Sequence, residues 1–598
     1  MNKFCKIAIL LGLWSISASL FEVRASIDFT EFHTPVQMDN ELTNLAATHS
    51  SIAQIFTIGN SVEGRPIRGI KITNNVAIDD PAKGDLVFIG TQHAREWMAA
   101  EMELFLAEYL VTHYATDLNL QACMNNLQIW IIPVANPDGY VFSAASPANR
   151  LWRKNRRNNM DGTFGVDINR NFSYQWGLDS GSSPVSSDET YRGPFAFSEP
   201  EAVHLRDFVQ SRHNPKAIVS YHSPAEVVLR PWRYVNTLAP GEPTLQYVVQ
   251  DMINRIAAVH GRTYGTSLGY NSSGSTLDYF WGEMRLMALT PELRSNAGGF
   301  DPPPSEIIPN NEENLPAALA LIKDAGCRTL WIKDYGGDTG VEPSAVWLGD
   351  HWSHAFWTSP DVWTDVDPPP AGGTVPLHVR VHNDKPVTQH SCIVRAYYTD
   401  PRVSLEFPNP GAVLIGEQTV DLPSGDTTVD FSWHVPSGTN IWGEHHWCVG
   451  ALVYHPDDKP LTNQIQRTSN IGGRNFQTVE VEAGGNLFVG ITNLLDVPAE
   501  FIVKVDPKSL PPGWRVEIPE VQKARKPSRK ALLLHVQNNV LSPGESFAQP
   551  IRIVAPKNMR RGSATDINIS GVLLPLVPGK RVPMGNGYTF RVTKRKGS

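Results

Sequence analysis

The order of secondary-structure signals constrains the fold of this chain more than any other feature, because it changes once, near Trp331. Before that point, short apolar runs typical of buried strands alternate with longer segments whose apolar residues recur at helical spacing. The strand signals lie at 85–90, 127–133, 217–221 and 287–290, and the helical signals at 96–113, 199–212, 244–260 and 314–324. This alternation predicts an α/β domain over residues 27–328, with a mixed, mainly parallel sheet flanked by helices.

After Trp331, short β-type runs separated by Pro, Gly, Asn and Asp turns replace the alternation. Runs of this kind, regularly spaced, are typical of β-sandwiches. We therefore expect an Ig-like sandwich over residues 340–477 and a second sandwich over 478–598. Histidines are scattered among these strands and form no cluster that indicates a site.

Residues 1–25 have the features of a secretory signal peptide. Lys3 and Lys6 precede an apolar run, and small residues stand at the −3 and −1 positions of a cleavage site after Ala25. The run falls short of the roughly 20 residues that a membrane span needs, so an uncleaved anchor is the weaker alternative. We expect a secreted or otherwise extracytoplasmic monomer without a membrane span. A net charge of −8 and a pI near 6.1 give no indication of a nucleic-acid partner.

Four cysteines remain after the signal peptide, an even number that permits two disulfides in an exported chain. Cys392 and Cys448 lie in two strand-like runs of one domain and are the natural pair, which leaves Cys123 with Cys327. The alternative is four buried free thiols. None of them is in a CxxC motif, so a zinc site built from cysteines is not expected.

One short segment carries the first indication of chemistry. His93 and Glu96 stand three residues apart where a predicted strand ends and a helix begins, so both side chains can reach one metal ion. His222 ends another predicted strand, and sites in open α/β sheets form beyond the carboxyl ends of strands. Two histidines and a glutamate with one open position are a catalytic zinc set. Each residue alone is weak evidence, since a strand-end histidine is more often structural.

Further motifs accompany these residues in a specific order. Residues 27–328 resemble the catalytic domain of the zinc carboxypeptidases of the carboxypeptidase A type, the M14 metallopeptidases. The resemblance covers about half of the chain, and no comparable match is recognised for the remainder. It rests on Gly64-Arg-Pro-Ile67, His93-Ala-Arg-Glu-Trp97, Asn136-Pro-Asp-Gly-Tyr140, Arg150-Leu-Trp-Arg153, Val166-Asp-Ile-Asn-Arg-Asn-Phe172, Ser220-Tyr-His-Ser223, Tyr270 with residues 274–278, and Thr290-Pro-Glu-Leu-Arg294.

The resemblance implies a role for each matching position. One Zn²⁺ is held by the three ligands, and Glu292 is the general base that takes a proton from the zinc water and passes it to the leaving amine. Arg153, together with the zinc, stabilises the oxyanion. Asp167 accepts the second ring N–H of His93. The alternative interpretation of Glu292 is a surface ion-pair partner, for instance of Arg294, and that of Arg153 is a solvated arginine in a basic run.

An exopeptidase must also recognise a free α-carboxylate at the end of a peptide or protein. The resemblance gives this task to Arg170, whose guanidinium suits a carboxylate, and to Asn169 beside it. It makes Tyr270 a mobile residue that closes over the substrate, and Arg95 a contact further up the peptide. The simpler interpretation of Tyr270 is an ordinary loop tyrosine.

The resemblance also places a pocket for the last side chain of the substrate. Leu277 would form its floor and Thr290, Ser272 and Leu229 its walls, which predicts a preference for apolar or aromatic C-terminal residues. The segment after Leu229 departs from the family pattern, and Arg230 or Arg233 in it would instead admit Asp or Glu.

Other interpretations stay open at this point. Ser267 lies in a GxSxG sequence, which favours a serine hydrolase only if a strand precedes it and a helix follows. A non-catalytic peptide-binding protein on the same fold would be expected to lack a ligand or the base, and this chain keeps them. A carboxypeptidase acting on cell-wall peptides through the same site is the third alternative.

Overall fold

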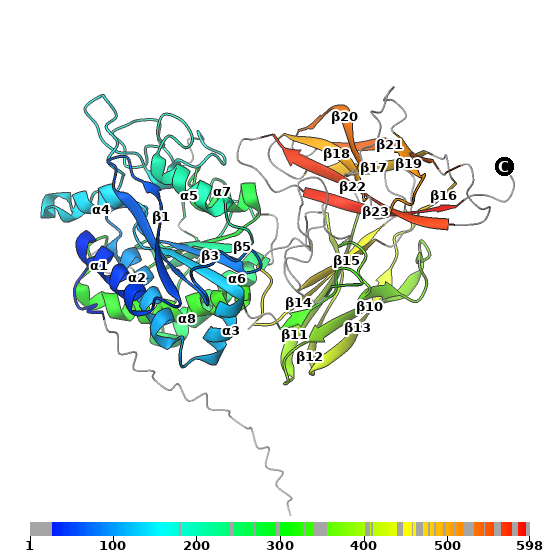
Figure 1. Cartoon of the computed structure of the whole chain (residues 1–598), viewed down its shortest axis with the longest axis horizontal. Helices are drawn as coiled ribbons and strands as arrows, with labels where there is room; N and C mark the ends of the chain where they lie inside the picture. The colour runs from blue at the N-terminus through cyan, green and yellow to red at the C-terminus, as the bar shows by residue number, and fades with distance from the viewer. Residues whose placement is uncertain are drawn as a thin grey trace, which may run out of the picture.

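The computed structural model shows an α/β body and two β-sandwiches (Figure 1). It describes residues 27–178, 181–239, 244–267, 269–294, 299–326, 329–338, 356–400, 407, 409, 411–438 and 447–461 except 457, then shorter stretches between 470 and 593. The predicted signal peptide lies outside the described residues. No helix among those described is long and apolar enough to cross a membrane.

The α/β body is built on a seven-stranded sheet, as predicted for the first half of the chain. The strands follow the order β1-β2-β4-β3-β5-β7-β6, and their bounds are β1 Ala53–Asn60, β2 Pro66–Ile72, β3 Gly84–Ile89, β4 Leu127–Ile132, β5 Pro215–Ser220, β6 Val227–Leu229 and β7 Met287–Glu292. The central strands β4, β3, β5 and β7 are parallel, and the outer pairs are antiparallel. The prediction of a mixed sheet with a parallel centre is therefore confirmed.

Burial explains why the central strands read as continuous apolar runs. Every residue of β3 and β4 is buried, because helices cover both faces of the sheet. Figure 1 shows α5 and α7 on one side of it and α2, α3 and α8 on the other. The helices are α1 Pro35–Thr48, α2 Trp97–His113, α3 Leu118–Asn126, α4 Pro137–Ala144, α5 Pro200–Gln210, α6 Thr244–His260, α7 Thr276–Met284 and α8 Ile307–Gly326, with short 3₁₀ turns at Pro147–Asn149, Ile168–Arg170 and Pro304–Glu306.

The first sandwich packs two sheets around one apolar core. One sheet has the order β13-β10-β8 with β9 beside β10, and the other the order β12-β11-β14-β15. Their bounds are β8 Leu330–Trp331, β9 Val362–Thr364, β10 Thr374–Asn383, β11 Gln389–Thr399, β12 Val413–Leu422, β13 Gly425–His434, β14 Cys448–Tyr454 and β15 Ile471–Asn475. Because β8 pairs with β10, the sheet reaches back to residue 330, ahead of the boundary predicted at 340.

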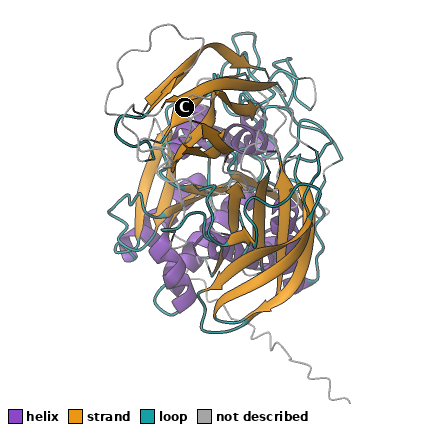
Figure 2. Cartoon of the chain, turned by 90° about the vertical axis from the view of Figure 1, so that its right-hand side faces the viewer, coloured by secondary structure: helices purple, strands orange, loops and turns teal. Residues whose placement is uncertain are grey.

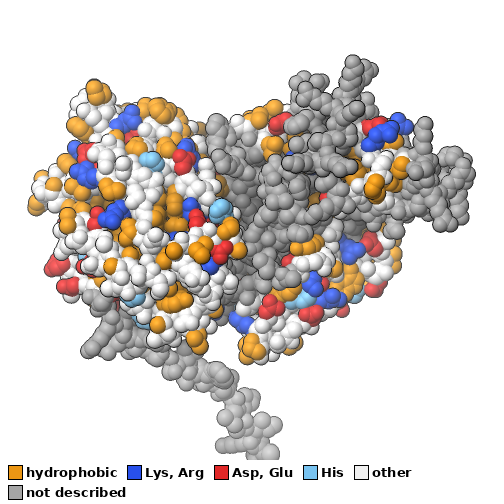
Figure 3. Space-filling model, in the orientation of Figure 1, with side chains coloured by type: hydrophobic (Ala, Val, Ile, Leu, Met, Phe, Trp, Pro, Cys, Tyr) orange, Lys and Arg blue, Asp and Glu red, His pale blue; other side chains and the backbone are white. Residues whose placement is uncertain are grey.

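The second sandwich packs a five-stranded sheet, β16-β23-β22-β18-β20, on a three-stranded one, β17-β21-β19. The strands are β16 Val479–Glu482, β17 Asn486–Thr492, β18 Ala499–Val505, β19 Arg515–Glu517, β20 Leu532–Leu541, β21 Ser546–Val554, β22 Ala564–Pro575 and β23 Met584–Thr593. Figure 2 looks onto the side of the sandwiches, whose strands lie in front of the helices of the α/β body. On the face drawn in Figure 3, basic and acidic side chains are interspersed over the α/β body.

The predicted Cys392–Cys448 disulfide is wrong, since both thiols are free and buried. The two cysteines lie on neighbouring antiparallel strands, but Cys448 pairs with Thr399, seven residues along β11 from Cys392. At roughly 3.3 Å per residue the cysteines are about 23 Å apart, far beyond the ~7 Å that a disulfide spans between Cα atoms. Cys123 is in a disulfide. Its predicted partner, Cys327, lies outside the described residues.

Candidate metal centre and substrate cleft

The site lies where the parallel strands end, as expected for an open α/β sheet. His93 and Glu96 follow β3, His222 follows β5, and Glu292 is the last residue of β7. Strands β3, β5 and β7 are neighbours in the sheet, so their carboxyl ends bring these side chains together. Residues separated by up to 199 positions in the sequence therefore form one site.

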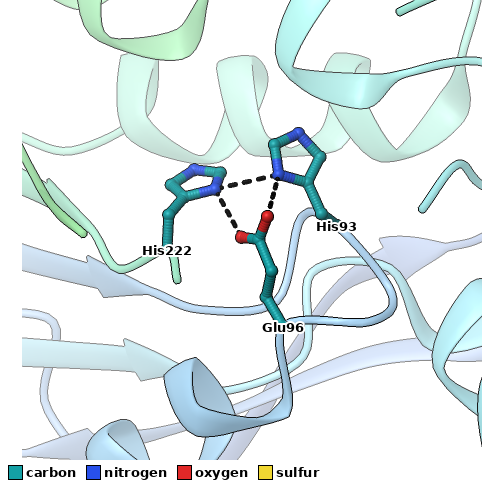
Figure 4. Close-up of side chains that lie close together, drawn as sticks. All are labelled: His93, Glu96 and His222. Carbon is teal, nitrogen blue, oxygen red and sulfur yellow. Dashed lines mark hydrogen bonds and ion pairs between the residues drawn. The ribbon is translucent and has the colours of Figure 1, made fainter. Parts of the chain in front are cut away.

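The side chains of His93, Glu96 and His222 converge on one point (Figure 4). The Nδ1 atoms of His93 and His222 are each 2.8 Å from an oxygen of Glu96 and 3.1 Å from each other. The three side chains are buried. Ligand atoms around a tetrahedral zinc ion lie about 3.3 Å apart, so this spacing suits a zinc ion with the fourth position open.

Hydrogen bonds to the other ring nitrogens hold both imidazoles in the orientation that a metal needs. His93 Nε2 is 3.1 Å from Asp167 Oδ1, and His222 Nε2 is 3.1 Å from Ser220 Oγ. A ring that donates its Nε2 proton presents the Nδ1 lone pair to the centre of the site. The predicted contact between Asp167 and His93 is thus present in the structure.

Burial and mutual contact shift the ionisation of all three side chains. Burial lowers the pKa of His222, but the adjacent Glu96 outweighs it and raises that pKa. Burial, followed by the nearby Arg153, lowers the pKa of His93, which keeps this ring neutral and able to act as a ligand. Burial disfavours the charge on Glu96, but the two histidines outweigh it and lower the pKa of this carboxyl. A neutral imidazole and an ionised carboxylate are the protonation states that zinc binding requires.

A cleft of about 300 Å³ opens onto this centre. Most of the residues predicted from the sequence line this cleft. They are His93, Glu96, Arg153, Asn169, Arg170, Leu229, Tyr270, Ser272, Leu277, Thr290 and Glu292. Burial, followed by the negative charge of Glu96, raises the pKa of Glu292 to about 7. A carboxyl with this pKa, beside a metal site and open to a cleft, can exchange protons near neutral pH.

Comparison with known proteins identifies the family of this site. The family model described as zinc carboxypeptidase matches residues 38–317. Carboxypeptidase A1 of Rattus norvegicus is 33% identical over 315 residues, which are 51% of this chain and 73% of the rat protein. Carboxypeptidase A1 of Homo sapiens is 32% identical over 50% of this chain and 71% of its own length. The chain belongs to the zinc carboxypeptidase family.

Among solved structures, carboxypeptidase A from Helicoverpa armigera aligns with a TM-score of 0.46 and 27% identity, over 50% of this chain and 75% of that one. Membership of the family makes this protein a hydrolase of the exopeptidase class and a zinc metallocarboxypeptidase of the carboxypeptidase A type. Ser267 is exposed in a loop and not between a strand and a helix, so the elbow that a serine hydrolase needs is not formed there.

Arg153 of this zinc carboxypeptidase lies between the metal centre and the cleft. Its Nε and Nη2 atoms donate to Asp167 Oδ2 at 3.0 and 2.7 Å. Its Nη1 atom is 3.8 Å from Glu96 Oε1. The pairing with Asp167 fixes the guanidinium plane and leaves Nη1 on the side of Glu96.

Arg170 and Asn169 line the same cleft of the carboxypeptidase. The guanidinium of Arg170 is buried and donates to the carbonyl oxygens of Gly181 and Asn169, at 2.6 and 2.8 Å. Within the described part of the chain it forms no ion pair with an acidic side chain. The side-chain oxygen of Asn169 accepts from Thr276 N at 2.9 Å, which fixes its amide beside the cleft.

Two of the arginines predicted to contact the substrate do not line the cleft. Of the two arginines that follow Leu229, Arg233 lines the cleft and Arg230 is not among the described residues that do. Arg95 is also outside the lining. It donates to Glu189 at 2.8 Å and lies 3.9 Å over the ring of Phe300.

Phe300 itself is part of the cleft wall, and sequence reasoning missed it. It lies in a loop beyond β7, after residues 295–298, which are outside the described part of the chain, and no motif marks it. An aromatic residue in a Gly-rich loop is a weak signal, because most such residues have no contact with a site.

Proposed function

We propose that this protein is a secreted enzyme that removes single residues from the C-terminal ends of peptides or proteins. Within the family assignment, the observation that supports this proposal best is the buried guanidinium of Arg170 beside the metal triad, which forms no ion pair among the described residues. A guanidinium binds a carboxylate through two parallel hydrogen bonds, so this end of the cleft suits a free α-carboxylate. The N-terminal apolar segment supports secretion.

The proposed mechanism assigns the metal to His93, Glu96 and His222. A zinc ion there supplies Lewis-acid chemistry, which polarises the scissile carbonyl and acidifies water. Glu292 takes a proton from the attacking water and delivers it to the leaving nitrogen. Its raised pKa of about 7 suits both transfers, because the acceptor becomes a donor in the second step.

Arg153 completes the chemistry as the donor that faces the developing negative charge on the carbonyl oxygen. Its two hydrogen bonds to Asp167 are already formed, so the guanidinium needs little reorganisation as the negative charge develops. Arg170 and Asn169 bind the α-carboxylate and place the last peptide bond at the metal. Tyr270, whose side chain is 55% exposed at the cleft, closes over that end of the substrate.

The test compares wild type with Glu292→Gln on a short peptide and on the same peptide with an amidated C-terminus. We expect release of the last residue from the free peptide only, and a kcat at least about 10³-fold lower in the variant. Zinc content, measured on the purified proteins, should be equal in both. Glu312→Gln, at an exposed glutamate on α8, is the matched control. Full activity in Glu292→Gln, or equal cleavage of the amidated peptide, would refute the mechanism.

The identity of the preferred C-terminal residue is a separate question. Leu229 and Leu277 in the cleft wall support the predicted preference for apolar or aromatic residues. That preference stays a prediction, and Arg233 in the same wall supports a different one.

A further inference from the structure

Two arginines in the cleft wall have no acidic partner among the described residues: Arg170, which is buried, and Arg233, which is half-buried. Arg153 is neutralised by Asp167, whereas Arg170 and Arg233 form no ion pair with any acidic side chain in the described part of the chain. The α-carboxylate of a peptide supplies one negative charge. A second carboxylate on the substrate would give each of the two arginines an ion-pair partner.

The backbone on either side of Arg233 is held firmly in place. The N–H of Arg233 donates to both oxygens of Asp278, at 2.8 and 3.0 Å, and the N–H of Tyr234 donates to the same carboxylate at 2.8 Å. Asp278 is buried in α7, directly after Leu277 of the predicted pocket floor. The carboxylate therefore positions the loop at the cleft through the backbone. Its charge acts on the guanidinium of Arg233, but no ion pair between the two side chains is formed.

The side chain of Arg233 leaves part of its hydrogen-bonding capacity unused. One terminal nitrogen donates to the carbonyl oxygen of Tyr270, while the Nε atom is buried and has no hydrogen-bond partner among the residues that the structure describes. Burying a cationic donor without a partner is costly, so such a group is normally matched by an anion. In an enzyme cleft, the substrate can supply that anion.

We propose that Arg233 makes this carboxypeptidase select peptides whose last residue is Asp or Glu. In this arrangement, which rests on the proposed function, Arg170 binds the α-carboxylate and Arg233 binds the side-chain carboxylate. Leu277 and Thr290 contact the methylene groups between the two charges. An apolar last residue leaves Arg233 desolvated and unpaired, and a Lys or Arg is repelled by it.

The experiment uses one peptide series that differs only in the last residue: Glu, Asp, Gln, Leu, Phe and Lys. For wild type we expect kcat/KM for Glu or Asp to exceed that for Gln, Leu or Phe by about 100-fold, with Lys the poorest. Arg233→Met should lose about 100-fold on Glu and Asp and change little on Leu or Phe. Arg230→Met removes the neighbouring arginine, which is outside the cleft lining, and should leave all ratios unchanged.

Two results would overturn the proposal. If wild type prefers Leu or Phe over Glu, the predicted apolar preference is correct and Arg233 does not select the substrate. If Arg233→Met slows every peptide by the same factor, Arg233 helps Arg170 to bind the α-carboxylate and has no role in specificity.

Binding to Glu292→Gln separates this inference from the proposed function. Calorimetry on that variant should show peptides ending in Glu binding about 100-fold more tightly than those ending in Leu, and the preference should disappear in the Arg233→Met, Glu292→Gln double variant. A binding preference without any peptide release refutes the proposed function alone. Release without a preference refutes the role of Arg233 alone.

Discussion

Lys459 connects the first sandwich to the α/β body through a buried charge cluster, and removing it should destabilise the catalytic half of the protein. Its ammonium is 3.1 Å from Asp251 on α6 and 3.1 Å from Asp324 on α8. The side chain is 1% exposed, and that of Asp324 is 2% exposed. Leu461, two residues later, is part of the apolar core of the α/β body.

The magnitude follows from these distances. At 3.1 Å and an effective dielectric constant of about 20, each pair is worth about 5 kcal/mol of Coulomb attraction. The cost of desolvating the ammonium offsets part of this, and breaking one side of a buried pair typically costs about 3–5 kcal/mol. Asp251 keeps its second partner, Arg255, at 2.7 Å, so the uncompensated charge after Lys459→Met is that on Asp324.

We expect Lys459→Met to lower the free energy of unfolding by about 3 kcal/mol. For a domain of about 300 residues this corresponds to a fall in the melting temperature of about 5 °C. Scanning calorimetry measures both quantities. The Lys459→Met, Asp324→Asn double variant removes the uncompensated carboxylate as well and should recover about half of the loss.

The loss of unfolding free energy caused by Lys459→Met should also depend on pH. Burial raises the pKa of Asp324 to about 7, and Lys459 opposes that rise, so without Lys459 the folded-state pKa is higher still. A carboxyl whose pKa is raised on folding loses stability as the pH increases from about 4 to its folded pKa. The loss caused by Lys459→Met should therefore be smaller at pH 5 than at pH 8. A loss below about 1 kcal/mol at pH 8, or a double variant less stable than the single one, would refute this reasoning.

Three further predictions concern the metal centre, the cleft and the first sandwich. Asp167→Ala removes the acceptor of His93 Nε2 and should weaken zinc binding about 10- to 100-fold in a chelator competition, whereas unchanged affinity would contradict the role of Asp167. Tyr270→Phe should raise KM about 5-fold with little change in kcat, in steady-state kinetics; a large fall in kcat alone would argue against a binding role. Burial lowers the pKa of His382, but hydrogen bonds to Asp361 and Asp426 outweigh it, so the pKa is raised above 6.5. This stabilisation is complete below about pH 6.5 and is lost as the pH rises through the folded pKa. His382→Asn should remove that part of the pH dependence in thermal unfolding, and an unchanged profile would contradict it.

The α/β sheet and the convergence of the metal triad were predictable because both follow from short-range patterns. Buried runs such as 127–133 gave β4, and neighbouring parallel strands place their ends at one edge whatever the loops between them do. His93, Glu96 and His222 each stand directly after such a run. Their meeting therefore depended on strand order alone.

The part of the cleft wall that follows Leu229 was less predictable because it is formed by a loop. Strand β6 ends at Leu229, so the alternation of side chains that would assign Arg230 or Arg233 to one face stops just before both of them. Arg233 reaches the cleft because its backbone N–H is held by Asp278, which lies 45 positions further along the sequence. The Cys392–Cys448 pairing was wrong for a related reason, since membership of neighbouring strands does not specify register.

The same limit applies to the relation between the two halves of the chain. A lone lysine in a loop of the first sandwich gives no sequence signal, yet its partners lie on α6 and α8 of the α/β body. Asp458 beside it accepts the N–H groups of Thr329 and Leu330, at 2.7 and 2.6 Å, where the chain leaves α8 for β8. Deleting the chain after residue 340 would thus expose a carboxylate that is buried in the intact protein and remove an anchor of its last helix. Loss of peptidase activity on such a deletion would report this damage as readily as any role of the sandwich in substrate binding. The Lys459→Met and double variants, which keep both sandwiches, separate the two effects.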